Sequence, residues 1–530
     1  MASLPQPASP TGSVTKDKLG VEDSRYEQAT SSKNVHGDAA LEILGDGATR
    51  HEFSESEDRT VLRKIDWRIM PVVCMVYLLQ QLDKSSVSYA SVFGFVEDTG
   101  LHGKQYSWLT SILYLAQLVW QPASSYMLVR FPLSKYLFIH VFMWGAIVCC
   151  MSAAHNFAGL LVARFFLAPC FITVTQMWWR RREQTFRLSM WMAVNGAAGA
   201  LGSLVTYGLG HAKSNILHEY QIIFLFIGAL TICCSPVVYF FLPDSPSTAK
   251  FLTQQEKVVA IERLRANNQG TESKEWKWSQ VWDTFLDPKT YLWFLLMFVC
   301  ATPSGGISAF GPLIINGFGF NQFETIVMNI PFNVIQIIVT LLSAVISMRL
   351  KLKSPVIIVL TLFPIGGASA LYALGRGPEL RNTLLGCYYI TAFFTGLQPM
   401  LYSWASQNTA GHTKKVTTTG VFFVAQCVGN VVGPLLYKTE DKPRYNNGLV
   451  ANLICWIILL VLTIITIFYL MMLNRSHARR RVAAGKSAVV VDTSLDNYRA
   501  DAEKRDGTGL NDRAFDDLTD KENEDFVYVL

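Results

Sequence analysis

The sequence predicts an all-α integral membrane protein in which 12 transmembrane helices form two six-helix bundles. Only 16% of its 530 residues are charged, whereas a soluble globular chain carries about a quarter. The charges are also segregated, because long apolar runs alternate with short polar joints from Arg68 to Asn474. Each run holds roughly 20 residues, which matches a hydrocarbon core about 30 Å thick. Soluble proteins rarely repeat buried helices of that length so often, so the pattern favours a membrane protein.

The apolar runs fall into two groups of six. Spanning helices are predicted at residues 69–90, 106–128, 135–154, 157–179, 188–210 and 221–242, and again at 290–314, 322–347, 354–374, 383–405, 416–437 and 449–472. The chain therefore divides into an N-terminal tail (1–66), a first bundle (67–242), a central loop (243–288), a second bundle (289–473) and a C-terminal tail (474–530). The N-terminal tail is rich in Ser, Gly, Asp and Glu and is expected to be disordered.

The central loop carries charged residues at helical spacing between Glu256 and Arg265. This spacing is typical of a solvated linker helix. Lys and Arg gather at one set of loops, which predicts that this side faces the cytoplasm. The opposite loops hold far fewer basic residues. Because the number of spans is even, both termini and the central loop are expected on the cytoplasmic side.

Several other classes of function find no support in the sequence. The net charge of +6 is modest, and its basic residues sit at helix ends, so it does not indicate nucleic-acid binding. All ten cysteines lie inside apolar runs, away from any loop where a disulfide could form. The known hydrolase, metalloprotease and nucleotide-binding motifs are missing, so we predict neither an enzyme nor a cofactor. Any uphill transport would then depend on an ion gradient.

Charged residues inside the predicted membrane segments are the strongest site candidates. An ionisable side chain at a helix centre costs about 2.5–3.5 kcal/mol by insertion scales, so it needs a partner or a function. Asp83 and Lys84 in the first helix and Arg164 in the fourth lie at the same predicted depth. Together they would give a cavity a net positive charge that attracts an anion, and Asp83 could exchange a proton. Alternatively, Asp83 and Arg164 form a structural ion pair, or Lys84 extends to the membrane surface.

Uncharged polar residues supply weaker candidates for substrate binding. Asn333 and Gln336 share a face of the eighth predicted helix, and Gln398 and Tyr402 share a face of the tenth. Hydrogen bonding between helices explains these residues as well as contact with a substrate does.

Pro303, Gly305 and Gly306 fall near the middle of the seventh predicted helix. Proline and glycine there are expected to break the helix and free backbone groups, which a membrane protein tolerates only where protein or a wet cavity satisfies them. These residues are therefore candidates for a gate or hinge.

Several short segments resemble the fungal allantoate permease family of anion:cation symporters. They cover the chain from about Asp58 to Asn474 and return near its end. The segments are Leu82-Asp83-Lys84, Tyr89-Ala90, Arg164-Phe165-Phe166-Leu167, Met177-Trp178-Trp179, Glu183-Gln184, Leu242-Pro243-Asp244-Ser245-Pro246, Ser403-Trp404, Asn408, Ala410-Gly411-His412-Thr413-Lys414, Gly429-Asn430, Gly433-Pro434, Pro443-Arg444-Tyr445 and Asp520-Lys521-Glu522-Asn523.

This resemblance implies the major facilitator fold, with a substrate path between the two bundles. It implies a monomeric symporter that takes up a small organic anion together with a proton across the plasma membrane. Ureides such as allantoate or ureidosuccinate, and vitamins such as nicotinate, pantothenate or biotin, are the implied substrates. The resemblance also implies that Asp83 and Lys84 form an acid–base pair in the cavity.

The sequence departs from the family pattern at three places. Lys84 replaces the usual arginine and loses its bidentate geometry. The joint from Tyr126 to Lys135 has no carboxylate. After Leu167 about seven residues are missing, including a glutamate that is a proton-coupling candidate in relatives, so Asp83 would act alone. The shortened fourth helix leaves open an alternative function, a transport-deficient receptor or sensor of the same fold.

Overall fold

The computed structural model describes residues 54–154, 156–167, 181–212, 217–244, 249–265, 277–350, 352–375, 377–438, 441–483, 485, 518–523 and 526–530. In the first half, helices are α3 (Glu55–Ala90), α4 (Phe95–Asp98), α5 (Gln105–Arg130), α6 (Leu133–Met151), α7 (Phe157–Phe166), α9 (Arg181–Leu209) and α10 (Glu219–Phe241). Next come α11 (Gln254–Arg265) and α12 (Trp278–Leu286). The second half has α13 (Pro288–Asn316), α14 (Gln322–Leu350), α15 (Ser354–Ala373), α16 (Arg381–Thr391), α17 (Leu397–Gln407), α18 (His412–Leu435) and α19 (Asn446–Ala483), and short 3₁₀ turns are η1 (Ser91–Phe93), η2 (Pro378–Leu380) and η3 (Ala392–Gly396).

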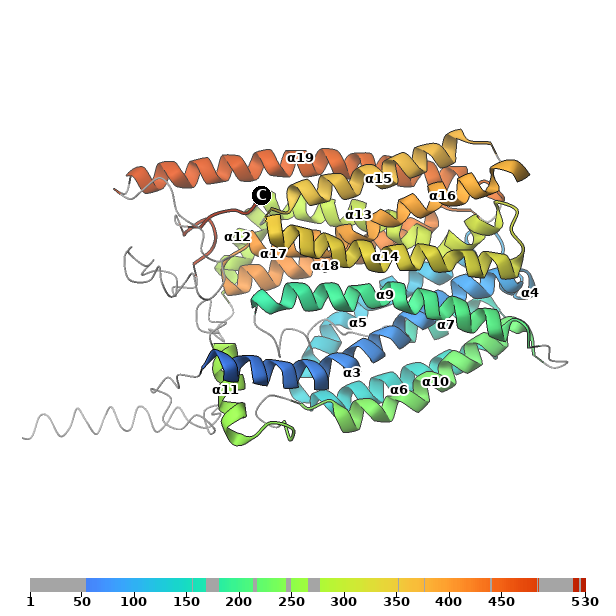
Figure 1. Ribbon diagram of the computed structural model, residues 1–530, viewed down its shortest axis with the longest axis horizontal. Helices are drawn as coiled ribbons and strands as arrows, with labels where there is room; N and C mark the ends of the chain where they lie inside the picture. The colour runs from blue at the N-terminus through green and yellow to red at the C-terminus, as the bar shows by residue number, and fades with distance from the viewer. Residues whose placement is uncertain are drawn as a thin grey trace, which may run out of the picture.

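The long helices run side by side along the longest axis of the molecule (Figure 1). The first half, from α3 to α10, lies on one side, and α13 to α19 lie on the other. The halves meet where α14 packs on α9 and α18 packs on α5. We call the end that carries α11 and α12 the α12 end, and the opposite end, where α4 lies, the α4 end (Figure 1).

Length and composition suit these helices to a bilayer. Among the described residues, eight helical segments are long and apolar enough to cross a membrane. Large apolar side chains point outward, including Phe240 at 71% exposure and Phe468 at 65%, as expected where lipid covers the surface. Inside the bundle, Trp293 and Trp404 are buried and meet edge to face at 5.1 Å between ring centroids. The prediction of an all-α membrane bundle in two halves agrees with this arrangement.

The helices extend further than their apolar runs. The N-terminal tail was expected to reach residue 66, but α3 begins at Glu55, because the Ser54 side chain and Glu57 form a capping box there. The expected linker helix is α11. The Nζ of Lys64 on α3 forms an ion pair with Oε1 of Glu256 on α11, at 2.6 Å. Residues 1–53 lie outside the described residues.

The C-terminal tail also differs from the prediction. It was expected to begin at residue 474 as a polar tail, but α19 continues to Ala483. Residues 518–523 and 526–530, which we call the C-terminal segment, return to the bundle at the α12 end, where Tyr528 and Asp520 are buried. The rest of that tail, including residues 486–517, lies outside the described part of the chain.

Two predicted helices have a different internal structure. The expected break at Pro303 is absent, since α13 is a continuous helix from Pro288 to Asn316. Proline at position 303 lacks only the N–H that would donate to the Val299 carbonyl, so one bond of the ladder is lost while the other turns of α13 continue. The tenth predicted helix, by contrast, is divided by η3 into α16 and α17.

Candidate functional site

Asp83 lies in the last third of α3 and is 1% exposed. The indole Nε1 of Trp144 on α6 donates to its Oδ2 at 3.3 Å. The other oxygen, Oδ1, has no hydrogen-bond partner among the described residues. A buried carboxylate needs several donors, and this one has a single long hydrogen bond. Asp83 therefore has one oxygen available for a proton or for a ligand.

Arg164, near the end of α7, is 2% exposed. Its Nη1 donates to the carbonyl of Leu109 on α5 at 3.0 Å. In the part of the chain that the structure describes, Nε and Nη2 have no hydrogen-bond partner. These two nitrogens form one edge of the planar guanidinium, and such an edge matches the two oxygens of a carboxylate. The described part of the structure thus leaves the carboxylate-binding edge of Arg164 vacant.

Lys84 follows Asp83 on α3 and is partly exposed. Its ammonium group lies 5.4 Å from the ring centroid of Tyr114 on α5, close enough for a cation–π contact. The charges of Asp83, Lys84 and Arg164 interact electrostatically. None of the ion pairs between described residues joins them. The three predicted charges are therefore neighbours without a direct ion pair.

A second polar cluster joins the halves near these charges. The Tyr89 hydroxyl donates to the Gly199 carbonyl of α9 at 2.8 Å, and the Asn329 amide of α14 donates to that hydroxyl at 3.3 Å. Asn333, one turn along α14, donates to the Asn329 carbonyl at 2.9 Å and is buried. Sequence reasoning did not select Tyr89 as a site residue or Asn329 at all, although Tyr89 stands in one of the segments that carry the family resemblance.

The remaining polar candidates are Gln336 on α14 and Gln398 and Tyr402 on α17. Gln336 and Gln398 are partly buried. The Tyr402 hydroxyl donates to Oε1 of Gln426 on α18. Tyr402 therefore has a helix-to-helix hydrogen bond, the structural alternative that the sequence left open.

Pro303, Gly305 and Gly306 lie where α13 packs closely on α18. A Cβ added at Gly305 would lie 2.9 Å from the Asn430 Cα, and one at Gly306 would lie 2.6 Å from the Tyr437 ring. Glycine permits this close approach of the two helices. The structure explains both glycines by packing, and their function as a hinge stays a prediction.

Hydrogen bonds between the halves gather toward the α4 end. The Ala309 carbonyl on α13 accepts from the Ser88 hydroxyl of α3 at 2.9 Å and from the Tyr106 hydroxyl of α5 at 2.8 Å. Two more bonds of this kind run from Ser107 to the Tyr437 carbonyl and from Ser111 to the Val431 carbonyl. The two halves are thus held together between the charged site and the α4 end.

The fourth-helix departure falls on residues 168–180, outside the described residues. Within the described part of the chain, His, Cys, Asp and Glu side chains form no group that could hold a metal ion.

The chain is similar to known membrane transporters. The family model described as Major Facilitator Superfamily matches residues 73–434. A Schizosaccharomyces pombe protein described as an uncharacterized transporter is 32% identical over 524 residues, which cover 97% of this chain and 95% of that protein. The allantoate permease of Saccharomyces cerevisiae is 28% identical over 510 residues, or 92% of this chain and 89% of that protein.

A solved structure supports the same fold. The proton:xylose symporter XylE bound to 6-bromo-6-deoxy-D-glucose superposes with a TM-score of 0.58 at 14% identity, and covers 79% of this chain and 96% of its own. Likeness at that identity concerns the fold alone. Because the family match spans most of the chain, the resemblance drawn from the sequence is confirmed: the chain belongs to the major facilitator superfamily, whose members are multi-pass membrane transporters and not enzymes.

Proposed function

We propose that this secondary transporter carries a small organic anion with a carboxylate group in symport with a proton. The vacant Nε–Nη2 edge of Arg164 is the observation that carries the proposal. Buried guanidinium donors without partners are costly, because a buried polar group needs a hydrogen bond. A substrate carboxylate would accept from both nitrogens at once, and a neutral substrate would offer a weaker bond. The site therefore suits an anion better than a sugar or an amide.

The charge balance supports the same conclusion. Lys84 and Arg164 carry two positive charges against one on Asp83, so the ionised site has an excess of one positive charge. A substrate carboxylate would cancel that excess. A proton that binds Oδ1 of Asp83 would raise the excess to two positive charges and so strengthen the attraction for the anion, and anion and proton would then bind together and be released together on the same side of the membrane. In this scheme Asp83 is the proton-coupling residue, and Lys84 and Arg164 bind the substrate.

The relatives narrow the substrate class. The printed name of one relative is allantoate permease, and allantoate is a ureide with a carboxylate. We propose a substrate of that size: a ureide such as allantoate or ureidosuccinate, or a vitamin such as nicotinate or pantothenate. Asn333, Gln336, Gln398 and Tyr402 would contact its uncharged part. Pro303, Gly305 and Gly306 would bend α13 during alternating access.

We further propose a monomer in the plasma membrane, with both termini and the α12 end in the cytoplasm. The excess of Lys and Arg in the loops at that end supports this orientation. A tag fused to either terminus should then react with antibody only after cells are permeabilised. Labelling of a terminal tag on intact cells would reverse the orientation.

The proposed function can be tested by binding of matched ligands to the purified transporter. Nicotinate, pantothenate and allantoate are compared with neutral analogues of similar shape, such as nicotinamide for nicotinate. At least one carboxylate should bind, and its neutral analogue should bind much more weakly. Equal binding of each acid and its neutral analogue, or no binding by any carboxylate, would refute the anion site.

Two variants at Lys84 then test the site itself. Loss of one partner from a desolvated charged contact costs about 2–5 kcal/mol, so Lys84→Gln should weaken binding of the anion at least about thirtyfold. Lys84→Arg keeps the charge and should bind as well as the wild type or better. Equal affinity in all three proteins would exclude Lys84 from the site. If anions bind but labelled anion never accumulates in cells, the chain is a receptor of this fold and not a symporter.

A further inference from the structure

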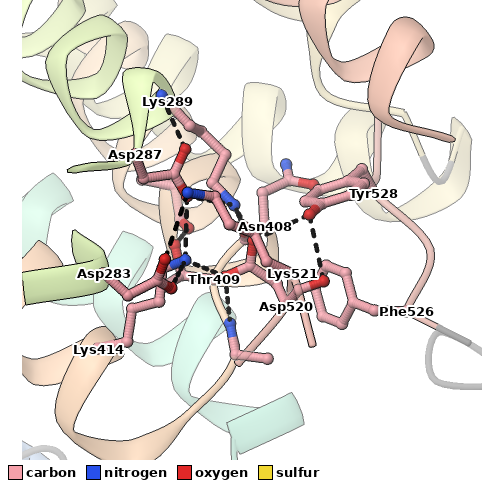
Figure 2. A network of polar contacts seen from close by, with 12 residues as sticks. Asp283, Asp287, Lys289, Asn408, Thr409, Lys414, Asp520, Lys521, Phe526 and Tyr528 are labelled. Carbon is pink, nitrogen blue, oxygen red and sulfur yellow. Dashed lines mark hydrogen bonds and ion pairs between the residues drawn. The ribbon is translucent and has the colours of Figure 1, made fainter. Parts of the chain in front are cut away.

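The C-terminal segment is bound at the α12 end of the second half by a set of defined polar contacts. Figure 2 shows its residues Asp520, Lys521, Phe526 and Tyr528 among side chains of α12, α13 and α18. Asn408, at the end of α17, donates its amide to the Val529 carbonyl at 2.9 Å and accepts from the Val529 N–H at 2.8 Å. Trp404 donates to the same carbonyl at 2.9 Å.

A second asparagine binds the neighbouring residue in the same way. Asn474 on α19 donates to the Tyr528 carbonyl at 2.9 Å and accepts from the Tyr528 N–H at 2.9 Å. The Lys353 N–H, before α15, donates to the Leu530 carbonyl at 2.8 Å. The backbone of residues 528–530 is therefore bound by α17, α19 and the start of α15, much as a neighbouring strand would bind it.

Four buried charges meet beneath this backbone. Lys289 contacts Asp520, and Lys414 lies 3.0 Å from Asp287 and 3.1 Å from Asp520. Each of the four side chains is at most 1% exposed. Tyr528 donates its hydroxyl to Asp520 at 2.9 Å, and Lys289 lies 4.7 Å from the centroid of the Tyr528 ring. The two positive and two negative charges cancel only while Asp520 is present.

The acid from the C-terminal segment is thus the shared counter-ion of two buried lysines. Burial alone would raise the pKa of Asp520, but Lys289 and Lys414 outweigh it and hold that pKa below its usual value. Without Asp520, Lys289 would keep only Asp287 among the described acids, at 3.8 Å. Lys414 would keep Asp287 and the partly exposed Asp283, at 2.7 Å, so the charge of Lys289 would be the less compensated one. An uncompensated buried ammonium group is strongly destabilising.

We propose that the α12 end of the second half is a peptide-binding site, and that its ligand is the C-terminal segment of the same chain. The site takes an acidic and aromatic peptide: Lys289 and Lys414 bind the carboxylate of Asp520, and Asn408 and Asn474 bind the backbone of Tyr528 and Val529. Because the docked peptide contacts α13, α15, α17, α18 and α19, it holds these helix ends as one body.

Hydrogen exchange of the full-length protein tests this directly. The amides of Tyr528 and Val529 donate to the two asparagines, so they should be protected in the wild type. Asp520→Asn keeps the size of the side chain and removes its charge. It should raise the exchange rate of these amides at least about tenfold, which is the effect of about 1.4 kcal/mol.

Glu522→Gln is the matched control. It removes the same charge from the same segment, but Glu522 is exposed, and its carboxylate accepts from the N–H of Thr519 and from no other described residue. The amides should stay protected in this variant. Asp520→Asn combined with Lys289→Gln removes one charge of each sign and should regain protection. Unchanged protection in Asp520→Asn, or equal loss in Glu522→Gln, would overturn the proposal.

Binding in trans gives a second measurement. A fluorescent peptide of residues 518–530 should bind a chain truncated after residue 517, and the same peptide with Asn at position 520 should bind at least about tenfold more weakly. The full-length wild type should bind neither, because its site is occupied. If the truncated chain does not fold, the full-length Asp520→Asn variant is used in its place, since its own segment should be displaced. A peptide that binds none of these proteins would refute the site.

Discussion

Asp83 and Arg164 are buried charged residues in a bundle whose outer surface is apolar, and among the described residues each lacks part of the pairing that burial demands. Within the described residues, Asp83 has one oxygen without a hydrogen-bond partner, and Arg164 has two such nitrogens. In a structural ion pair these atoms would bind one another. Their separation supports a site that is completed by a proton and a substrate rather than a pair that is already complete.

Replacement of Asp83 by asparagine separates proton coupling from substrate exchange. The amide resembles the protonated acid in size and in hydrogen bonding, but it does not titrate. Asp83→Asn should therefore abolish proton-driven accumulation and leave exchange of substrate at equal concentrations on both sides. Uptake and exchange of labelled anion in vesicles, with and without a pH gradient, measure the two activities.

Asp98→Asn serves as the control, because Asp98 is an exposed acid on α4 that pairs with His218 at the surface. It should keep both activities. If Asp83→Asn still accumulates substrate with the pH dependence of the wild type, another residue couples the proton.

The sequence predicted the charged residues of this site but not their uncharged neighbours. A charge inside an apolar run stands out because it is costly there. Trp144 contacts Asp83 and Asn329 contacts Tyr89, yet aromatic and amide side chains are common in membrane helices, and nothing in their spacing links them to the charges. Only the folded structure brings these side chains of α6 and α14 to α3.

At the scale of the helix, the apolar runs predicted where the chain crosses the membrane but not where helices end. Hydrophobicity has no signal for the first turns of α3 or the last turns of α19, which lie beyond the apolar runs. The capping residues Ser54 and Glu57 are visible in the sequence and could have been used. The C-terminal segment could not be predicted in the same way, because Asp520 pairs with lysines more than 100 positions away.

Glycine in these helices allows close packing, which gives a prediction for α13 and α18. A Cβ at Gly429 would lie 2.6 Å from the Phe298 carbonyl oxygen and 3.1 Å from the Thr302 nitrogen. Backbone atoms cannot rotate away as a side chain can, so Gly429→Ala should destabilise the protein by roughly 1–3 kcal/mol. Thermal unfolding of the purified protein in detergent measures the loss.

Gly420→Ala is the comparison within the same helix. A Cβ there meets nothing within 4 Å, and alanine favours the helix by up to about 1 kcal/mol over glycine. This variant should be as stable as the wild type or more so. Equal stability of the two variants would show that close contact between α13 and α18 is not what glycine provides at position 429.

The whole molecule consists of two halves that must move against each other if it works by alternating access. Bonds that cross between the halves near the α4 end therefore contribute to the balance between conformations. The Ala309 carbonyl is a shared acceptor, since it receives hydroxyls from both α3 and α5. Among the described residues, the C-terminal segment contacts helices of the second half and Asp283 of α12, so it acts on that half.

Tyr106→Phe tests whether the bonds that cross between the halves contribute to the balance between conformations. The variant keeps the edge-to-face contact with Phe310, 5.2 Å between centroids, and loses the bond to Ala309, while Ser88 still satisfies that carbonyl. A net hydrogen bond contributes about 0.5–1.5 kcal/mol, so the population open at the α4 end should rise about two- to twelvefold. Spin labels at the exposed positions His102 and Lys438, one on each half, report that opening as a longer distance.

Tyr291→Phe is the control, because the Tyr291 hydroxyl bonds to the Phe285 carbonyl at 2.8 Å without crossing between the halves. It should leave the distance distribution unchanged. The same distance distribution in the wild type and both variants would mean that the bond to Ala309 does not stabilise the closed α4 end. Packing of α5 against α18 would then be what stabilises it.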